Sequence, residues 1–298
     1  DYKTTIDDGS PAVTLFSPQG APRPYFGQFG WVPIGELKVP DSKTVWQADR
    51  PSLQPSRPLT LSWDNGHDVR FIQVIEIDDN FMMTVTQRVE NSSTQAISTH
   101  PYGRIARTHT PDTLGFYILH EGPLAVFNDT LKEVDYDDLQ EGPADATKST
   151  GGWIGITDKY WLAALIPDQK EPYTGTFRFS QPNKQDTYQA DFMTQTPQVI
   201  APGATAQTVS HIFVGAKEVN LLDRYEVQLG IARFDLAVDF GWFYFLTKPL
   251  FFVLDYFFKM LGNFGLAILL LTVCVKAIFF PLANKSYKSM SKMKALQP

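Results

Sequence analysis

The sequence predicts a mainly β fold: a β-sandwich domain followed by an interfacial amphipathic helix and one transmembrane α-helix. Three observations predict it. Short segments rich in β-branched and aromatic residues run from Leu59 to about Ala216, residues 240–261 are aromatic but interrupted by charges, and residues 264–283 are apolar with a single charge. Short alternating runs indicate strands, and an apolar run of about 20 residues indicates a membrane span.

Residues 1–58 are rich in proline and glycine, as in SPQGAPRP (17–24), with aromatic residues between the breakers. Both residue types interrupt regular structure, so we expect loops with short strands in this region. Position 1 is Asp and no leader pattern follows it, which leads us to expect a piece of a longer protein, cut at both ends.

The clearest strand is 81–90, where apolar and polar residues alternate, and the break Asp78-Asp79-Asn80 joins it to a second strand, 69–77, as in a hairpin. No intervening helical pattern is evident, which favours two packed sheets over a parallel α/β sheet. The further predicted strands are 114–119, 152–157, 160–166, 173–180, 186–194 and 205–215.

A change of pattern near residues 216–220 marks the end of the β domain. Apolar residues recur at helical spacing from Leu221 to Leu236. We therefore predict a domain of residues 1–219 and a connecting helical segment of residues 220–239.

Residues 240–261 contain Lys248, Pro249, Asp255 and Lys259, which interrupt the apolar run too often for a membrane span. An amphipathic helix in the membrane interface fits this composition better, and a buried core helix is the alternative. Aromatic rings with one polar atom favour the headgroup layer, and long lysines reach it. The predicted interface residues are Trp242, Tyr244, Tyr256 and Lys259.

Residues 264–283 give 20 positions with one charge, which span roughly 30 Å as a helix and match a bilayer core. We place the transmembrane helix at 262–284. A basic flank follows it, whereas the preceding chain is acidic, so the positive-inside rule places the C-terminus in the cytoplasm and the β domain outside. The flank consists of Lys285, Lys288, Lys292 and Lys294.

Lys276 is the single charge within the apolar helix, about two turns from its C-terminal end. A charge at this depth costs several kcal/mol unless it reaches water or a partner, so it indicates a functional site. The alternative is a lysine that extends its ammonium to the headgroups. Thr272 lies four residues earlier on the same face, and the pair indicates a polar stripe. We expect Pro281 to bend or end the helix, and a basic helix to follow.

Composition excludes several other functions. All 32 acidic residues lie at or before Asp255, so residues 1–255 carry a net charge of −12 and the remainder +6, which argues against a nucleic-acid binder. The single cysteine, Cys274, forms no intrachain disulfide. We predict no catalytic residues, no metal and no cofactor, because no nucleophile motif appears and the histidines lack metal-ligand spacing; they are His67, His100, His109, His120 and His211.

Asp135, Asp137 and Asp138 form an acidic cluster without the spacing of a calcium loop, and we expect a solvated loop there.

Six segments of the chain resemble the YidC/Oxa1/Alb3 family of membrane protein insertases, in the bacterial form with a large periplasmic domain. The strongest likeness is in FDLAVDFGWFYFLTKPLF (234–251), GNFGLAILLLTVCVKAIFFPL (262–282) and SMSKMKALQP (289–298). Supporting likeness is in SPQGAPRPYFGQFGW (17–31), GGWIGITDKYW (151–161) and FVGAKEVNLLD (213–223).

The resemblance implies a periplasmic β-super-sandwich, and a transmembrane helix that is the first of a five-helix core around a hydrophilic groove. Lys276 matches the cationic position of that groove, where most relatives have arginine, and Thr272 matches a groove-lining hydroxyl. Because lysine lacks the planar guanidinium, charge attraction is kept but fork-like pairing with carboxylates is in doubt. Residues 285–298 match the start of a cytoplasmic helical hairpin.

The resemblance also implies a location in the bacterial inner membrane and a set of partners. These are nascent inner-membrane proteins, the Sec translocon with its accessory subunits, the phospholipid bilayer, and the ribosome through parts outside this chain. The rival hypothesis is a membrane-anchored carbohydrate-binding or carbohydrate-active β-sandwich, with Trp63, Trp153 and Trp161 as stacking residues. A third is that the β domain is an interaction module.

Overall fold

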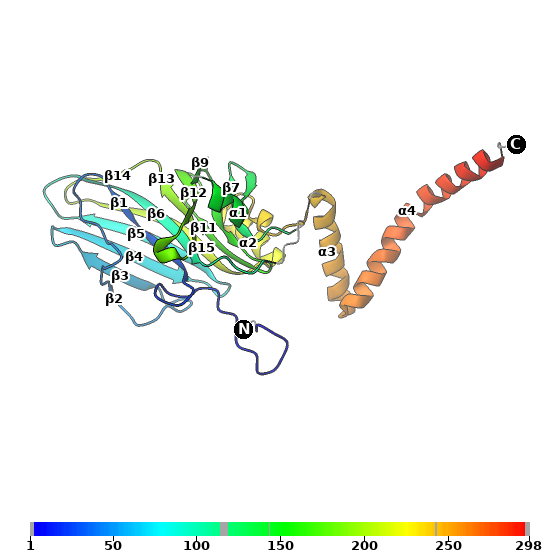
Figure 1. The fold of residues 1–298 in the computed structure, drawn as a ribbon, viewed down its shortest axis with the longest axis horizontal. Helices are drawn as coiled ribbons and strands as arrows, with labels where there is room; N and C mark the ends of the chain where they lie inside the picture. The colour runs from blue at the N-terminus through cyan, green and yellow to red at the C-terminus, as the bar shows by residue number, and fades with distance from the viewer. Residues whose placement is uncertain (1–2, 114–118, 143, 242, 296–298) are drawn as a thin grey trace. The chain divides into compact units, whose positions relative to one another are not determined.

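The computed structural model describes residues 3–113, 119–142, 144–241 and 243–295 (Figure 1). The chain divides into two compact units, Asp1–Asp239 and Phe240–Pro298. The first unit holds all the strands in the described part of the chain, and the second holds two helices.

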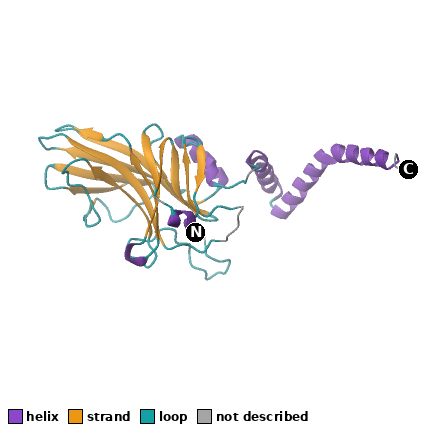
Figure 2. Cartoon of the chain, turned by 45° about the horizontal axis from the view of Figure 1, so that its top comes forward, coloured by secondary structure: helices purple, strands orange, loops and turns teal. Residues whose placement is uncertain are grey.

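Two antiparallel sheets form the first unit (Figures 1 and 2). Among the described residues, one sheet has six strands: β1 (Tyr25–Pro33), β6 (Ile97–Thr108), β13 (Thr187–Thr194), β12 (Pro172–Ser180) and β9 (Asp145–Thr150) in this spatial order, with β14 (Gln198–Ile200) also pairing with β6. The other, counted over the same residues, has nine: β2 (Gln47–Ala48), β3 (Leu59–Asp64), β4 (Val69–Ile77), β5 (Met82–Asn91), β15 (Thr205–Ala216), β11 (Trp161–Ile166), β10 (Gly152–Thr157), β7 (Gly122–Phe127) and β8 (Thr130–Glu133). The prediction of a mainly β sandwich is confirmed.

Most predicted strands are confirmed by β4, β5, β10, β11, β12, β13 and β15. The predicted strand 114–119 lies, except for Leu119, outside the described residues. One short helix, α1 (Tyr136–Glu141), was not predicted. The expected solvated loop at Asp135–Asp138 is therefore wrong. Asp135 precedes α1, and Asp137 and Asp138 lie in the first turn of α1, where their negative charges interact favourably with the helix dipole.

β1 is longer than the expected short strands, because its glycines leave room for side chains from neighbouring strands. A Cβ on Gly30 would lie 2.8 Å from the ring of Tyr102, and one on Gly27 would lie 2.6 Å from Ile212. β6 was not predicted at all, since Pro101 interrupts it. Proline is tolerated here because β13 and β14 both pair with β6 but in different registers, and Pro101 lies at the change between them.

The main core lies between the sheets, where Ile105 and Phe192 of one sheet meet Ile154 and Ile212 of the other. A second core covers the opposite face of the nine-stranded sheet. There α2 (Val219–Leu229) and the 3-10 turn η2 (Phe234–Ala237) bury Leu222 and Phe234. A further 3-10 turn, η1 (Pro182–Lys184), connects β12 and β13. The chain thus continues past the last strand as part of the β domain's packing.

The second unit consists of α3 (Tyr244–Leu261) and α4 (Phe264–Ala295), joined at Gly262, which has φ 64° and ends α3 in the left-handed conformation. Pro281 was expected to bend or end the helix, and it does not end it, since α4 continues through Pro281. Figure 2 shows that α4 changes direction along its length. Proline removes one backbone donor and displaces the carbonyl four residues earlier, which bends a helix without ending it when turns persist on both sides.

Candidate functional site

α4 is long and apolar enough to cross a membrane over Phe264–Lys288, 25 residues, as judged by length and composition. Only 6% of its most apolar stretch is buried against the rest of the chain. The core helix of a water-soluble domain would be mostly covered. The exposed apolar surface of α4 therefore requires lipid or further protein around it.

The two predicted groove residues lie on a face of α4 that α3 leaves uncovered. Ala267 is fully buried, and Leu271 and Val275, one and two turns further on, are half-buried. These three follow the seam against α3. Thr272 and Lys276 are both exposed, and at about 100° per residue they lie more than a quarter turn away from that seam.

The Thr272 hydroxyl donates to the carbonyl of Ile268 at 2.8 Å, so its hydrogen bond is satisfied within the helix. Among the residues that the structure describes, the Lys276 ammonium has no hydrogen bond or ion pair. This face of α4 therefore carries the Thr272 hydroxyl, which is already hydrogen-bonded, and the Lys276 ammonium, whose charge no described residue pairs with. Such a face attracts an anionic group or water.

The predicted interface residues lie on α3, except Trp242, which is outside the described residues. Tyr244, Lys248, Asp255 and Lys259 form one polar stripe by their helical spacing. Lys259 pairs with Asp255 at 2.6 Å, and the Lys248 ammonium lies 5.6 Å from the centre of the Tyr244 ring. Large apolar side chains are exposed on the remaining surface, Phe245 at 74% and Met260 at 56%. Tyr256 is also exposed and flanks the stripe.

The basic flank continues α4. Lys285 and Lys288 are exposed on it. Lys292 and Lys294 lie on the same helix, in a part where only the backbone is described.

The histidines with described contacts in the β domain make hydrogen bonds within that domain. His100 Nδ1 lies 2.8 Å from the Thr194 carbonyl, and His211 Nδ1 lies 3.1 Å from the Thr84 hydroxyl. Burial lowers the pKa of His211, with a smaller opposing effect from Asp168. His120 Nε2 lies 3.0 Å from the Pro123 carbonyl.

A partly buried ionic cluster links β6 of the six-stranded sheet to the turn after β10 of the nine-stranded sheet. The Arg107 guanidinium lies 2.6 Å from Asp158, and it also lies over the Tyr25 ring, at 4.8 Å from the ring centre. Burial raises the pKa of Tyr25 and of Tyr136, while the charge of Arg107 opposes both shifts. These groups hold the two sheets together.

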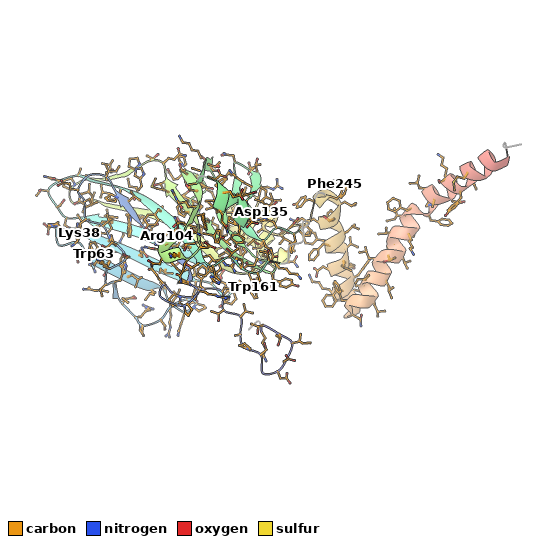
Figure 3. The ribbon with its side chains drawn as sticks, in the orientation of Figure 1. Lys38, Trp63, Arg104, Asp135, Trp161 and Phe245 are labelled. Atoms are coloured by element: carbon orange, nitrogen blue, oxygen red, sulfur yellow. The ribbon has the colours of Figure 1, made fainter. Side chains whose placement is uncertain are left out.

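The proposed carbohydrate-stacking surface is not formed. Trp153 is fully buried, where it packs at 5.6 Å on Phe234 and its indole N–H donates to the Arg233 carbonyl. Trp63 lies beside Lys38 at one end of the β domain and Trp161 at the other (Figure 3). The suggestion that these three tryptophans line one face is wrong, since sequence does not show which aromatic side chains point inward.

Sequence reasoning missed one acidic cluster. Asp223, Glu226 and Asp235 bring carboxylate oxygens within 4.8 Å of one another, because η2 folds back onto α2. The backbone N–H of Asp235 donates to Glu226 at 2.9 Å, and Arg233 lies 3.6 Å from Asp235. Arg233 and the backbone N–H of Asp235 offset part of the negative charge of this cluster.

Comparison with known proteins adds to this picture. Residues 1–253 match the family described as YidC periplasmic domain, and residues 256–298 match the family described as 60Kd inner membrane protein.

Three curated relatives illustrate the likeness, and each is a protein named membrane protein insertase YidC. The relative from Methylorubrum extorquens is 46% identical over all of this chain and 50% of its own length. The relative from Granulibacter bethesdensis is 45% identical over all of this chain and 53% of its own, and that from Rickettsia bellii is 42% identical over the same shares. The chain thus spans about half the length of the curated relatives it matches.

Among solved structures, a galactose mutarotase related enzyme from Lactobacillus acidophilus aligns with 57% of this chain and 71% of its own, at 10% identity and a TM-score of 0.43. A putative aldose 1-epimerase from Escherichia coli aligns with 57% of this chain and 68% of its own, at 14% identity and a TM-score of 0.38. Likeness at this level supports no inference about activity.

Proposed function

Because the chain belongs to the YidC family of membrane protein insertases, we propose that it forms part of an insertase and chaperone of the bacterial inner membrane. In this proposal the whole protein helps newly made proteins to enter and fold in the membrane, alone or with the Sec translocon. The observation that carries the proposal is the position of Lys276 and Thr272 on the face of α4 that α3 leaves uncovered.

The mechanism is physical. A positive, hydrated groove attracts acidic residues in the short extracytoplasmic segment of a substrate, while apolar surface beside it receives the emerging helix. Moving polar groups part-way into lipid otherwise costs several kcal/mol each. Lys276 supplies the attraction, and the portions of the relatives that extend beyond this chain supply the other walls of the groove. The protein makes and breaks no covalent bond, so it is not an enzyme.

The topology follows the charge distribution. Residues 1–219 form the periplasmic domain, residues 220–239 connect it, residues 240–261 lie in the membrane interface, residues 262–284 cross the membrane, and residues 285–298 begin a cytoplasmic hairpin. The stripe on α3 favours headgroups, and each exposed lysine of the basic flank contributes about 1 kcal/mol against an anionic cytoplasmic leaflet. Nascent chains, the Sec translocon with its accessory subunits, and the ribosome are the partners in this proposal.

The test replaces Lys276 in the intact protein and follows insertion of a short single-span substrate. Lys276→Glu reverses the charge, and we expect insertion to fall several-fold. Lys276→Arg keeps the charge, and we expect insertion to persist. Lys170→Glu is the matched control, since it makes the same change at an exposed site of the β domain. Equal insertion by the Lys276→Glu and Lys170→Glu variants would remove the proposed role of Lys276.

A further inference from the structure

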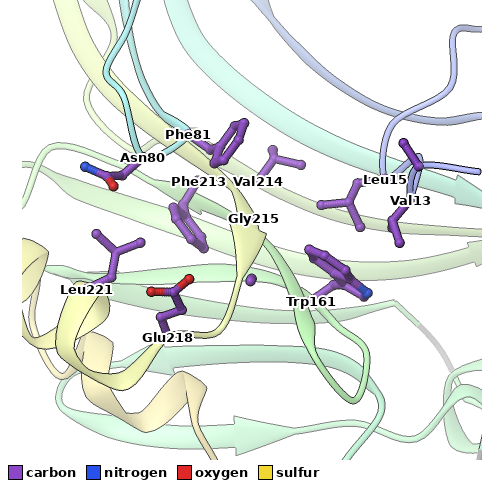
Figure 4. A pocket seen from close by; sticks show the side chains of 12 residues that line it. Val13, Leu15, Asn80, Phe81, Trp161, Phe213, Val214, Gly215, Glu218 and Leu221 are labelled. Carbon is purple, nitrogen blue, oxygen red and sulfur yellow. The ribbon is translucent and has the colours of Figure 1, made fainter. Parts of the chain in front are cut away.

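A pocket of about 270 Å³ lies in the first unit, where β5 ends and β15 continues beyond it (Figure 4). Its walls come from segments far apart in the sequence. Val13, Leu15 and Trp161 lie on one side, and Phe213, Leu221 and Glu218 lie on the other. The pocket is mainly apolar.

The pocket exposes an unpaired edge of β15. β5 pairs with β15 as far as Met82 opposite Phe213, and the Val214 N–H reaches the Phe81 carbonyl at only 3.4 Å. The next residue of β15 whose backbone N–H and carbonyl face the side of β5 is Ala216. Its carbonyl accepts the N–H of Glu218, but its own N–H and the carbonyl of Val214 have no hydrogen-bond partner among the residues that the structure describes. A free edge of this kind is a template for another strand.

Phe81 lies at the mouth of the pocket in a rare backbone conformation. Its φ is +69°, unusual for a bulky residue, and its ring is 55% exposed. The turn before it is braced, because the Asp78 carboxylate accepts the N–H groups of Asn80 and Met82 and the hydroxyl of Tyr225 on α2. Backbone strain held in place by surrounding structure is concentrated at ligand-binding sites.

We propose that this pocket binds an extended peptide that pairs with β15 at Val214 and Ala216 and places an apolar side chain beside Gly215. Gly215 has no side chain to fill the space next to the Phe213 ring. The unpaired N–H and carbonyl favour a polypeptide over a lipid acyl chain, which forms no hydrogen bonds along its length. Strand addition of this type obtains affinity from main-chain bonds and specificity from side-chain pockets.

Charge defines the peptide further. Glu218 lies in the wall, and Asp78 and Asp79 are exposed in the turn beside Phe81. The described residues that line the pocket include no lysine or arginine. The preferred peptide therefore has an apolar residue flanked by basic ones. This site lies in the β domain and does not depend on the function proposed for Lys276.

The test uses the full chain in lipid nanodiscs and a fluorescent peptide of alternating valine and lysine, with binding followed by anisotropy. A second peptide has the same side chains but N-methyl groups on alternate amides, which remove the donors for strand pairing. We expect the parent peptide to bind and to slow hydrogen exchange at the Ala216 amide. We expect N-methylation, or replacement of lysine by glutamate in the peptide, to weaken binding at least tenfold.

Two variants support the peptide comparison. Phe81→Ala removes the ring at the mouth, and Gly215→Val fills the pocket; each is expected to weaken binding about tenfold. Val45→Ala is the control, because Val45 is 83% exposed and does not line the pocket.

Absence of binding by the parent peptide would overturn the proposal. Equal binding by the N-methylated peptide would overturn it too, and displacement of that peptide by dodecanoate would then identify an acyl-chain site instead.

Discussion

Replacing Phe234 by alanine tests whether the segment after α2 is part of the β domain's core. The Phe234 ring is fully buried, and it packs edge-to-face against Trp153 at 5.6 Å and Phe213 at 5.9 Å. Truncating a buried phenylalanine costs about 3–5 kcal/mol, and each aromatic pair contributes about 0.5–1.5 kcal/mol beyond the buried area. We therefore expect the free energy of unfolding to fall by about 4 kcal/mol.

The assay is urea unfolding of the full chain in detergent, followed by tryptophan fluorescence, since Trp153 reports directly on this contact. Phe234→Leu keeps most of the volume, and we expect it to lose about 1 kcal/mol. Phe81→Ala is the matched control, because that ring is 55% exposed, and we expect a change within about 0.5 kcal/mol. A loss below about 1 kcal/mol for Phe234→Ala would show that η2 does not anchor to the sheet.

Three further predictions concern the same domain. Gly152→Ala should lower the free energy of unfolding in urea by at least about 3 kcal/mol, because Gly152 has φ +92° and an added Cβ would lie 1.9 Å from the Val126 carbonyl. Gly203→Ala is the control: Gly203 has φ +73° but open space around it, so the loss should be only about 1 kcal/mol. Equal losses in the two variants would contradict this reasoning. Arg107→Ala should lower the free energy of unfolding by about 2–3 kcal/mol, because it leaves Asp158 unpaired. Arg107→Lys should recover only part of that stability, and denaturant titration would measure both losses. Stability should fall as pH rises above about 10, because burial raises the pKa of five tyrosines, so that the unfolded chain releases protons that the folded chain retains. The five are Tyr25, Tyr102, Tyr136, Tyr173 and Tyr225. A stability that stays flat up to about pH 12, with tyrosine ionisation followed by absorbance, would refute this prediction.

The strands that could be predicted are those whose pattern is local. β5 alternates from Val85 to Asn91 because one face meets the core, and its hairpin with β4 follows from the polar break between them. β1 and β6 could not be predicted in this way. The glycines of β1 make room for rings from other strands, and Pro101 is tolerated because of a register change in a neighbour, so both depend on contacts that sequence does not display.

In the candidate sites, too, the features that could be predicted are those that depend on local sequence. Lys276 stands out because a charge in an apolar run is costly wherever its partners are. The hydrogen bond of Thr272 to Ile268 is also local, since a hydroxyl reaches back one turn of its own helix. The edge of β15 could not be predicted, because it depends on where β5, α2 and the N-terminal segment end relative to one another. The role of Trp153 was likewise hidden, since its burial is set by η2, about 80 residues later in the chain.

The strand order of the six-stranded sheet has a consequence for the timing of folding. β1 pairs only with β6 among the described strands, and β6 in turn lies next to β13 and β14, which come near the end of the domain. During synthesis β3, β4 and β5 can pair as soon as they emerge, because they are neighbours in both sequence and space. The sandwich cannot close until residues near 200 are available, just before the apolar helices are made. Its slowest step, the long-range pairing, therefore coincides with the synthesis of the apolar helices α3 and α4.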